Sequence, residues 1–460
     1  MVFACLLVAV GCGLAMRRPD RVRHRLRPRE QALATVLLTA LVCTAVVGLA
    51  VLRTDLRTRA LEEHLGTRLE VVLTLGEEPQ RLDGWSGDRF RAPARLVAVR
   101  DPGGPWESAT APVLVLGGEE WTRVDVGERV LVAGRLAPTA AGDPVAALLV
   151  AQDEPVVVTP TPAWQRLVNR LRSGLVTASS PLAPQARGLV PGITLGDTRA
   201  LPAELEADLR TVNLTHVTAV SGAHVAIILG AALLGVCWLP RTARVVIGGL
   251  VLLGFVALVH PSGSVLRSAT MGAVMLVGMA VARPRATIPA LWVSTIVLLA
   301  VDPWLSRSFG FVLSVLATGG LLLWAGPIAA ALARFLPRPV ALALAIPVAA
   351  QLACGPVILL LQPGLSAHGV LANLLSAPAV PPATVLGVVA TLVGPIWPGA
   401  AVVLAGWAGT CTAWIASVAT WTAGLPAATL PWPGGLGGGA ALVVLLLATL
   451  LLLRRMLHPG

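Results

Sequence analysis

Residues 339–361 read PVALALAIPVAAQLACGPVILLL, a run of 23 residues without one charged side chain. A helix that crosses a bilayer needs about 20 mainly apolar residues, so this run predicts a membrane-spanning helix. The rest of the chain has the same character. Hydrophobic residues make up 55% and charged residues only 13% of the 460 positions, and the mean hydropathy is +0.78. Because soluble proteins carry roughly 25% charged residues, lipid is expected to surround most of this chain.

Ten further apolar runs continue this pattern. They lie at 2–16, 31–52, 215–239, 243–259, 264–282, 286–301, 308–325, 369–393, 400–422 and 436–453. With 339–361 they predict about eleven spans, and hence a polytopic α-helical membrane protein. The run 369–393 contains Pro378, Pro381 and Pro382, so we expect it to be broken or re-entrant. The pairs Gly355-Pro356 and Gly394-Pro395 also predict interrupted helices, which are tolerated where they line a water-filled space.

The positions of the arginines predict the orientation. All 35 basic residues are arginine, and seven of them lie between residues 17 and 29. Cytoplasmic loops carry an excess of basic residues. Placing 17–29 in the cytoplasm also places there the pairs Arg241/Arg244, Arg283/Arg285, Arg334/Arg338 and Arg454/Arg455. The absence of lysine and tyrosine is typical of a GC-rich bacterial genome, so we expect a bacterial cytoplasmic membrane, with the N-terminus outside and the C-terminus in the cytoplasm.

The segment 53–160 differs in kind from the apolar runs. It holds 17 of the 24 acidic residues and 12 arginines, so its net charge is about −5. Short apolar runs at 69–75, 95–99, 112–116, 130–136 and 145–150 alternate with turn residues such as the Asp-Pro-Gly-Gly stretch at 101–104. This spacing predicts about five strands in a small extracytoplasmic barrel or sandwich, and periodicity does not choose between the two.

The residues 161–213 predict two helices between this domain and the third span. In the first, an apolar face with interleaved arginines indicates a helix that lies in the membrane interface: Trp164, Leu167, Val168 and Leu171, with Arg166, Arg170 and Arg172. In the second, Pro202 suits a first helical turn, and Leu205, Leu209 and Val212 form an apolar stripe.

The least lipid-like part of a predicted span is THVTAVSGAHV at residues 215–225. Ser221 and His224 fit a nucleophile and its base, but no acid stands nearby to orient the histidine. His216 and His224 are eight residues apart with no further metal ligand in the run. We favour a third interpretation, in which Ser221-Gly222 breaks or tightly packs the helix while the histidines bond backbone carbonyls; a role in lining a cavity is the fourth.

Two other polar residues stand inside predicted spans. Arg267 lies one turn inside a span on the outer side, where the orientation does not explain it, so snorkelling to the interface and a functional role are equally open. Asn373 is flanked by apolar residues and suits a hydrogen bond between helices. Asp302 is the only acidic residue after Asp208, at an outer helix end where a cap or an ion pair with Arg307 would suffice.

Several of these motifs together resemble the ComEC competence-protein family. They are GLVPGITLGD at 188–197, LTH at 214–216 and AVSGAHV at 219–225, supported by SVLR at 264–267, Asp302-Pro303 followed by Gly310-Phe311, and ANLLSAP at 372–378. The order of a soluble segment and then a multi-helix domain also fits this family, so the resemblance covers nearly the whole chain.

The resemblance implies a channel that admits one strand of transforming DNA across the cytoplasmic membrane. It also implies an OB-like barrel at 53–160, and makes Asp197, His216, Ser221, His224, Arg267 and Asn373 candidates for lining the DNA path. Two departures matter. Val312 stands where many relatives have glutamine. Many relatives also continue into a metallo-β-lactamase-like domain, whose ligand run these seven histidines do not contain.

We therefore expect four domains: two N-terminal spans with an arginine-rich loop (1–52), the β domain (53–160), the interfacial helices (161–213) and a channel domain (214–460). The expected partners are single-stranded DNA, the bilayer, a DNA receptor and a cytoplasmic translocase. No enzyme activity, catalytic residue, metal or cofactor is predicted. Two alternatives stay open: a transporter for a small or lipid-linked substrate, and a membrane scaffold. A transporter would be expected to contain internal repeats and an acidic residue within a span, and neither is evident in the sequence.

Overall fold

The computed structural model describes residues 61–82, 89–140, 143–259, 263–280 and 287–457, together with residues 44, 48, 51 and 52. The predicted span 2–16, and most of 31–52, lie outside these residues. The chain divides into two compact units, one of residues 1–173 with 296–308 and one of residues 174–295 with 309–460.

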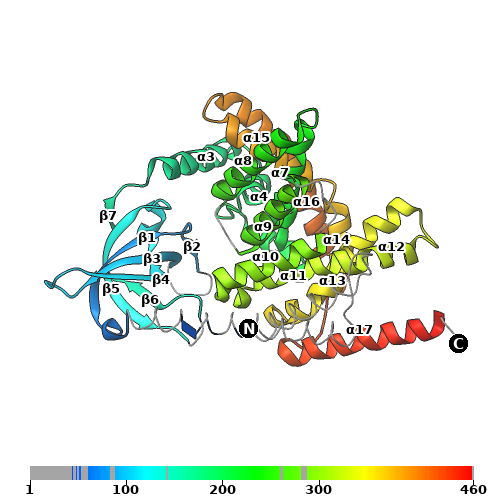
Figure 1. Ribbon diagram of the computed structural model, residues 1–460, viewed down its shortest axis with the longest axis horizontal. Coiled ribbons are helices and arrows are strands. Elements are labelled where there is room, and N and C mark those ends of the chain that lie inside the picture. The colour runs from blue at the N-terminus through cyan, green and yellow to red at the C-terminus, as the bar shows by residue number, and fades with distance from the viewer. Residues whose placement is uncertain are drawn as a thin grey trace, which may run out of the picture. The chain divides into compact units, whose positions relative to one another are not determined.

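The first unit contains a closed barrel of five strands. They are β1 (Arg68–Leu75), β3 (Phe90–Arg100), β4 (Glu107–Gly117), β5 (Arg129–Pro138) and β6 (Ala147–Ala151). Each contains all or most of one predicted apolar run. The strands pair in the order β1-β3-β4-β6-β5, and β5 pairs back with β1, which makes a barrel and not a sandwich (Figure 1). Two short strands, β2 (Gln80–Arg81) and β7 (Val156–Thr159), pair with β3 and β5.

Alternation along the strands fills the barrel interior. In β1 the side chains of Leu69, Val71, Leu73 and Leu75 are at most 1% exposed, while the residues between them are partly exposed. This period of two places every second side chain on the inner face. A short 3₁₀ helix at Glu119–Arg123 adds the fully buried Trp121 to the same core. Burial of this single apolar face gives the unit its own core.

Helix α3 (Ala163–Ser179) packs its first half onto the barrel. The side-chain Nδ2 of Asn169 donates to the carbonyl of Val126 at 3.0 Å. Arg172 is 4% exposed and pairs with Glu78 at 3.0 Å. The sequence predicted an amphipathic helix in the membrane interface, with Arg172 among its interleaved arginines. The structure buries Arg172, and a carboxylate 94 residues earlier compensates its charge.

The remaining helices follow along the chain. They are α4 (Pro184–Leu195), α5 (Ala203–Thr211), α6 (Thr215–Thr218), α7 (Gly222–Gly235), α8 (Arg241–Val259), α9 (Gly263–Ala280), α10 (Thr287–Val301), α11 (Phe309–Gly320), α12 (Gly326–Leu332), α13 (Arg338–Leu361), α14 (Gly369–Ser376), α15 (Val380–Val393), α16 (Pro398–Ala423) and α17 (Gly435–Leu457). A π-helical turn at Leu321–Ala325 joins α11 to α12 just before Pro327. The predicted stripe of Leu205, Leu209 and Val212 along α5 is buried.

Four stretches of these helices are long and apolar enough to cross a membrane. They are α8, the continuous Phe309–Leu332, α13 and α16. The pair α14 and α15 counts as a fifth if a bent pair is one span, and its bend of 52° confirms the break predicted from the prolines. Four shorter apolar helices lie within α7, α9, α10 and α17. The total of eleven spans stays a prediction.

Two expectations about continuity have opposite outcomes. The run 215–239 forms a single turn, α6, and then α7, and the interruption at 219–221 confirms the break predicted at Ser221-Gly222. By contrast, the interruption predicted at Gly355-Pro356 is wrong, since α13 runs unbroken through Pro347 and Pro356. A proline leaves one helical carbonyl without its N–H partner, but packing against a neighbouring helix permits this. Helix α17 packs closely against α13 at Pro356, since a Cβ added at Gly439 would lie 2.8 Å from the Pro356 carbonyl oxygen.

Candidate functional site

The interruption before α7 has a local cause in Ser221. Its backbone is extended, with φ −114° and ψ 175°, and Ser221 is the N-cap of α7. The Ser221 backbone N–H donates to Nδ1 of His224 at 3.1 Å, which completes a capping box. Serine at an N-cap followed by an acceptor three residues later is a helix-start signal. The structure therefore contains the helix break that the serine–glycine pair predicted.

His224 is 1% exposed and lies at this helix start. Because Nδ1 accepts the Ser221 N–H, the neutral ring carries its proton on Nε2. That Nε2 is buried and has no partner among the residues that the structure describes. The Ser221 Oγ lies 3.0 Å from Nδ1, a distance that would also suit a nucleophile and its base. The capping geometry accounts for this contact without a catalytic role, and no described carboxylate orients the ring.

Arg267 on α9 is the centre of a second polar group. Its side chain is buried, 3% exposed. Its Nε lies 3.0 Å and its Nη2 2.5 Å from Ser314 Oγ on α11, and Nη2 also donates to Ser268 Oγ at 2.9 Å. Nη1 lies 2.9 Å from the Met271 sulfur. All these acceptors are neutral, so no carboxylate in the described part of the chain compensates the guanidinium charge.

Gly222 joins the two polar groups. A Cβ added at Gly222 would lie 2.6 Å from Ser268 Oγ and 2.8 Å from Arg267 Nη2. Contacts below 3.0 Å do not occur for real Cβ atoms, so only glycine lets the guanidinium approach the start of α7 this closely. Helices α7, α8 and α9 pack against one another, and α9 also packs against α11 (Figure 1). Sequence reasoning named Ser221, Gly222, His224 and Arg267 but missed Ser268 and Ser314 as partners of the arginine.

The other candidate residues form their hydrogen bonds with partners outside the group around Arg267 and Ser221. Asp197 follows α4 and is 4% exposed, and its carboxylate forms a two-point pair with Arg199 at 2.9 and 2.6 Å. His216 on α6 is exposed, and its Nδ1 lies 3.1 Å from the Asn213 carbonyl oxygen. Asn373 donates to the Gly369 carbonyl within its own helix at 2.8 Å. Asp302 accepts the Trp304 N–H at 3.1 Å, which is the predicted cap.

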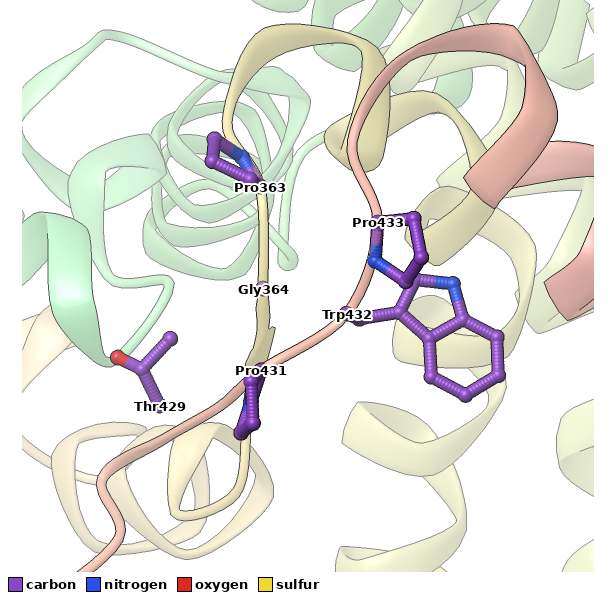
Figure 2. A pocket seen from close by; sticks show the side chains of 6 residues that line it. All are labelled: Pro363, Gly364, Thr429, Pro431, Trp432 and Pro433. Atoms are coloured by element: carbon purple, nitrogen blue, oxygen red, sulfur yellow. The ribbon is translucent and has the colours of Figure 1, made fainter.

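An open hollow of about 600 Å³ lies elsewhere in the second unit (Figure 2). Its lining comes from the end of α13 and from the segment before α17: Pro363, Gly364, Thr429, Pro431, Trp432 and Pro433. None of these side chains is titratable, and Thr429 carries the single hydroxyl among them. No cluster of three or more metal-ligating side chains occurs in the described ranges.

Apolar helices of membrane-crossing length, next in sequence to a closed β-barrel, define a multi-pass membrane protein with a separate β domain. The chain belongs to the competence protein family, whose family model matches residues 193–457. This match begins within α4 and includes both the break before α7 and Arg267. No curated protein and no solved structure matches the chain.

Proposed function

We propose that this protein is the channel through which single-stranded transforming DNA crosses the bacterial cytoplasmic membrane. Its N-terminus and barrel lie outside and its C-terminus lies in the cytoplasm. The observation that supports this most directly is the buried Arg267 beside the broken start of α7, in a chain that belongs to the competence family. A polyanion that crosses a low-dielectric layer needs positive charge along its path, because an uncompensated charge there is costly.

The backbone breaks favour a conduit over a simple anchor. Non-helical backbone at membrane depth is tolerated where it is buried in protein or lines a water-filled space. The helices are interrupted between α6 and α7 and again between α14 and α15. An ion-coupled transporter would be expected to hold an acid among these helices. The only acidic residue after Asp208 is Asp302, and its carboxylate caps a 3₁₀ turn.

The barrel is OB-like in this proposal. If the two short strands are set aside, the five barrel strands follow the order 1-2-3-5-4 with strand 4 closing onto strand 1, and only the β4–β6 pair is parallel. This is a compact Greek-key barrel of the kind that binds single strands. Its net charge of about −5 argues against attraction of DNA by the domain as a whole. Two arginines, however, lie close together on its surface. Arg95 and Arg129 both lie directly across from Thr74 and are exposed on one face.

The proposed partners follow from the direction of transport. A receptor outside the membrane delivers the strand, and a cytoplasmic translocase withdraws it. The proposal includes no enzyme activity for this chain, and degradation of the second strand is assigned to another protein.

Deletion of the gene in a competent host tests the proposal. Acquisition of chromosomal markers should be abolished, because the strand has no other path through the bilayer. The purified chain, supplied with manganese, zinc or magnesium, should leave labelled single- and double-stranded DNA intact. Normal transformation of the deletion strain would exclude the channel. Cleavage that disappears in a His224→Ala variant would exclude the non-enzymatic assignment.

A further inference from the structure

Arg267 presents a problem of charge balance. Moving an ion into a protein interior costs several kcal/mol even after relaxation, and a partner of opposite charge normally offsets that cost. The buried Arg172 follows this pattern by pairing with Glu78. Arg267 is equally buried, yet within the described residues its guanidinium contacts only two hydroxyls and a thioether. After Asp208 the sequence holds a single acid, Asp302, and its carboxylate caps a 3₁₀ turn.

The start of α7 adds positive potential at the same place. The first N–H groups of a helix have no partner inside the helix, and the helix dipole makes this end positive. Gly222, the first residue of α7, is the point at which the guanidinium approaches the backbone. His224, two residues later, holds a buried Nε2 donor without a described partner. A cation and a helix N-terminus thus meet at Gly222 with no described anion between them, and the first turn of the same helix holds a buried donor without a described partner.

We infer that these groups form a seat for one phosphodiester oxyanion of the passing strand, made by Arg267 and the first turn of α7. This inference rests on the proposed function, and it specifies what the site recognises. Guanidinium N–H groups and helix N-termini are both suited to phosphate oxygens. Such a seat binds the backbone that all nucleotides share and contacts no base, so it holds any sequence equally well. Ser268 and Ser314 hold the guanidinium in place between transits.

Salt dependence of binding tests the seat directly. The full chain in lipid nanodiscs is titrated with a fluorescent single-stranded thymidine oligonucleotide at several salt concentrations. Each phosphate contact on a single strand contributes about 0.7 to the slope of log K against log salt. We expect Arg267→Gln to reduce the slope by about 0.7, and to lower DNA uptake in cells with unchanged membrane abundance. The same oligonucleotide with a neutral methylphosphonate backbone should bind both proteins equally and weakly.

Two matched pairs of variants separate the seat from a folding effect. Arg210→Gln removes an arginine that already pairs with Glu206 and should leave the slope unchanged. Gly222→Ala keeps Arg267 but pushes its guanidinium from the start of α7, and should reproduce the slope of Arg267→Gln. Gly230→Ala on the same helix meets open space and should behave as wild type.

The outcomes distinguish the seat from the channel. An unchanged slope in both Arg267→Gln and Gly222→Ala would overturn the seat and leave the channel standing, since marker acquisition in the deletion strain tests the channel independently. Failure of the wild-type chain to bind the oligonucleotide at any salt concentration would also overturn the seat. A reduced slope in Gly222→Ala alone supports it even if Arg267→Gln does not accumulate in the membrane.

Discussion

At the scale of single residues, two arginine–carboxylate pairs show how burial changes the contribution of an ion pair to stability. The pair Arg172–Glu78 has side chains only 5% and 20% exposed. The pair Arg210–Glu206 on α5 joins side chains 60% and 47% exposed. In the exposed pair, water stabilises each charge almost as well as the opposite charge does. That pair therefore contributes less than about 1 kcal/mol to the free energy of unfolding. Water is largely removed from the buried pair, so the contact between its two charges contributes more.

We therefore expect Glu78→Gln to destabilise the contact between α3 and the barrel by about 3 kcal/mol, because the buried Arg172 loses the charge of the carboxylate that pairs with it at 3.0 Å. Native-state hydrogen exchange of the full chain measures this as faster exchange, on the order of a hundredfold, in peptides of β1 and the first half of α3. Glu206→Gln is the control and should change exchange little. Equal effects of the two variants would contradict the assignment.

Arg172 also shows what the sequence could not predict about single residues. Its place among alternating apolar and basic residues indicated an interfacial helix and did not reveal the ion pair that Arg172 forms. The partner that buries it lies 94 residues earlier, beyond the reach of any helical period. The same holds for Arg267, whose partner Ser314 is 47 residues away. By contrast, the N-cap at Ser221 was predictable, since its capping partner is three residues distant.

At the scale of elements, the bend between α14 and α15 leaves a carbonyl to be satisfied. In a continuous helix the Ala379 N–H would bond the Leu375 carbonyl, but here it donates to Ser376. The indole Nε1 of Trp414 on α16 takes its place and donates to the Leu375 oxygen at 2.9 Å. A side chain from a neighbouring helix thus stabilises the broken backbone, as expected where water is scarce.

Replacing this donor should weaken the bent pair. We expect Trp414→Phe to lower the free energy of unfolding by about 1 kcal/mol, the scale of a hydrogen bond between membrane helices plus an unsatisfied carbonyl. Titration of the purified chain with a denaturing detergent measures the change. Trp407→Phe, seven residues earlier on the same helix and also exposed, removes an indole that has no hydrogen bond within the described residues, and should cost less. A larger loss in Trp407→Phe would refute this role for Trp414.

Element boundaries were predictable where the cause is local and not where it is tertiary. The five apolar runs of the β domain each became a strand, because alternation and turn residues act within a few positions. Proline predicted the bend after α14 but not the continuity of α13. In α13 the tertiary surroundings differ, since Gly439 of α17 packs closely against Pro356. The closure of the barrel, β5 onto β1, likewise depends on pairing between distant strands.

At the scale of the whole molecule, the arginine distribution makes an orientation testable. Family membership and the helix lengths define a multi-pass protein but leave the sides of the membrane unassigned. Our proposal places the barrel outside and the arginine-rich loop 17–29 inside, because basic loops are retained in the cytoplasm. The same orientation puts the proposed seat on the route of an incoming strand. An inverted protein would present its barrel to the cytoplasm and would contradict the proposed direction of uptake.

Labelling with a membrane-impermeant maleimide decides the orientation. In a cysteine-free background, a cysteine at Gly104 should react in right-side-out spheroplasts, whereas one at Arg25 should react only after lysis. Gly104 suits the substitution because it lies in the β3–β4 turn and a Cβ there would make only ordinary contacts, the nearest 3.4 Å away. Its neighbour Gly103 has φ +82°, which disfavours any other residue. The reverse labelling pattern would invert every span and exclude uptake through an outward-facing barrel.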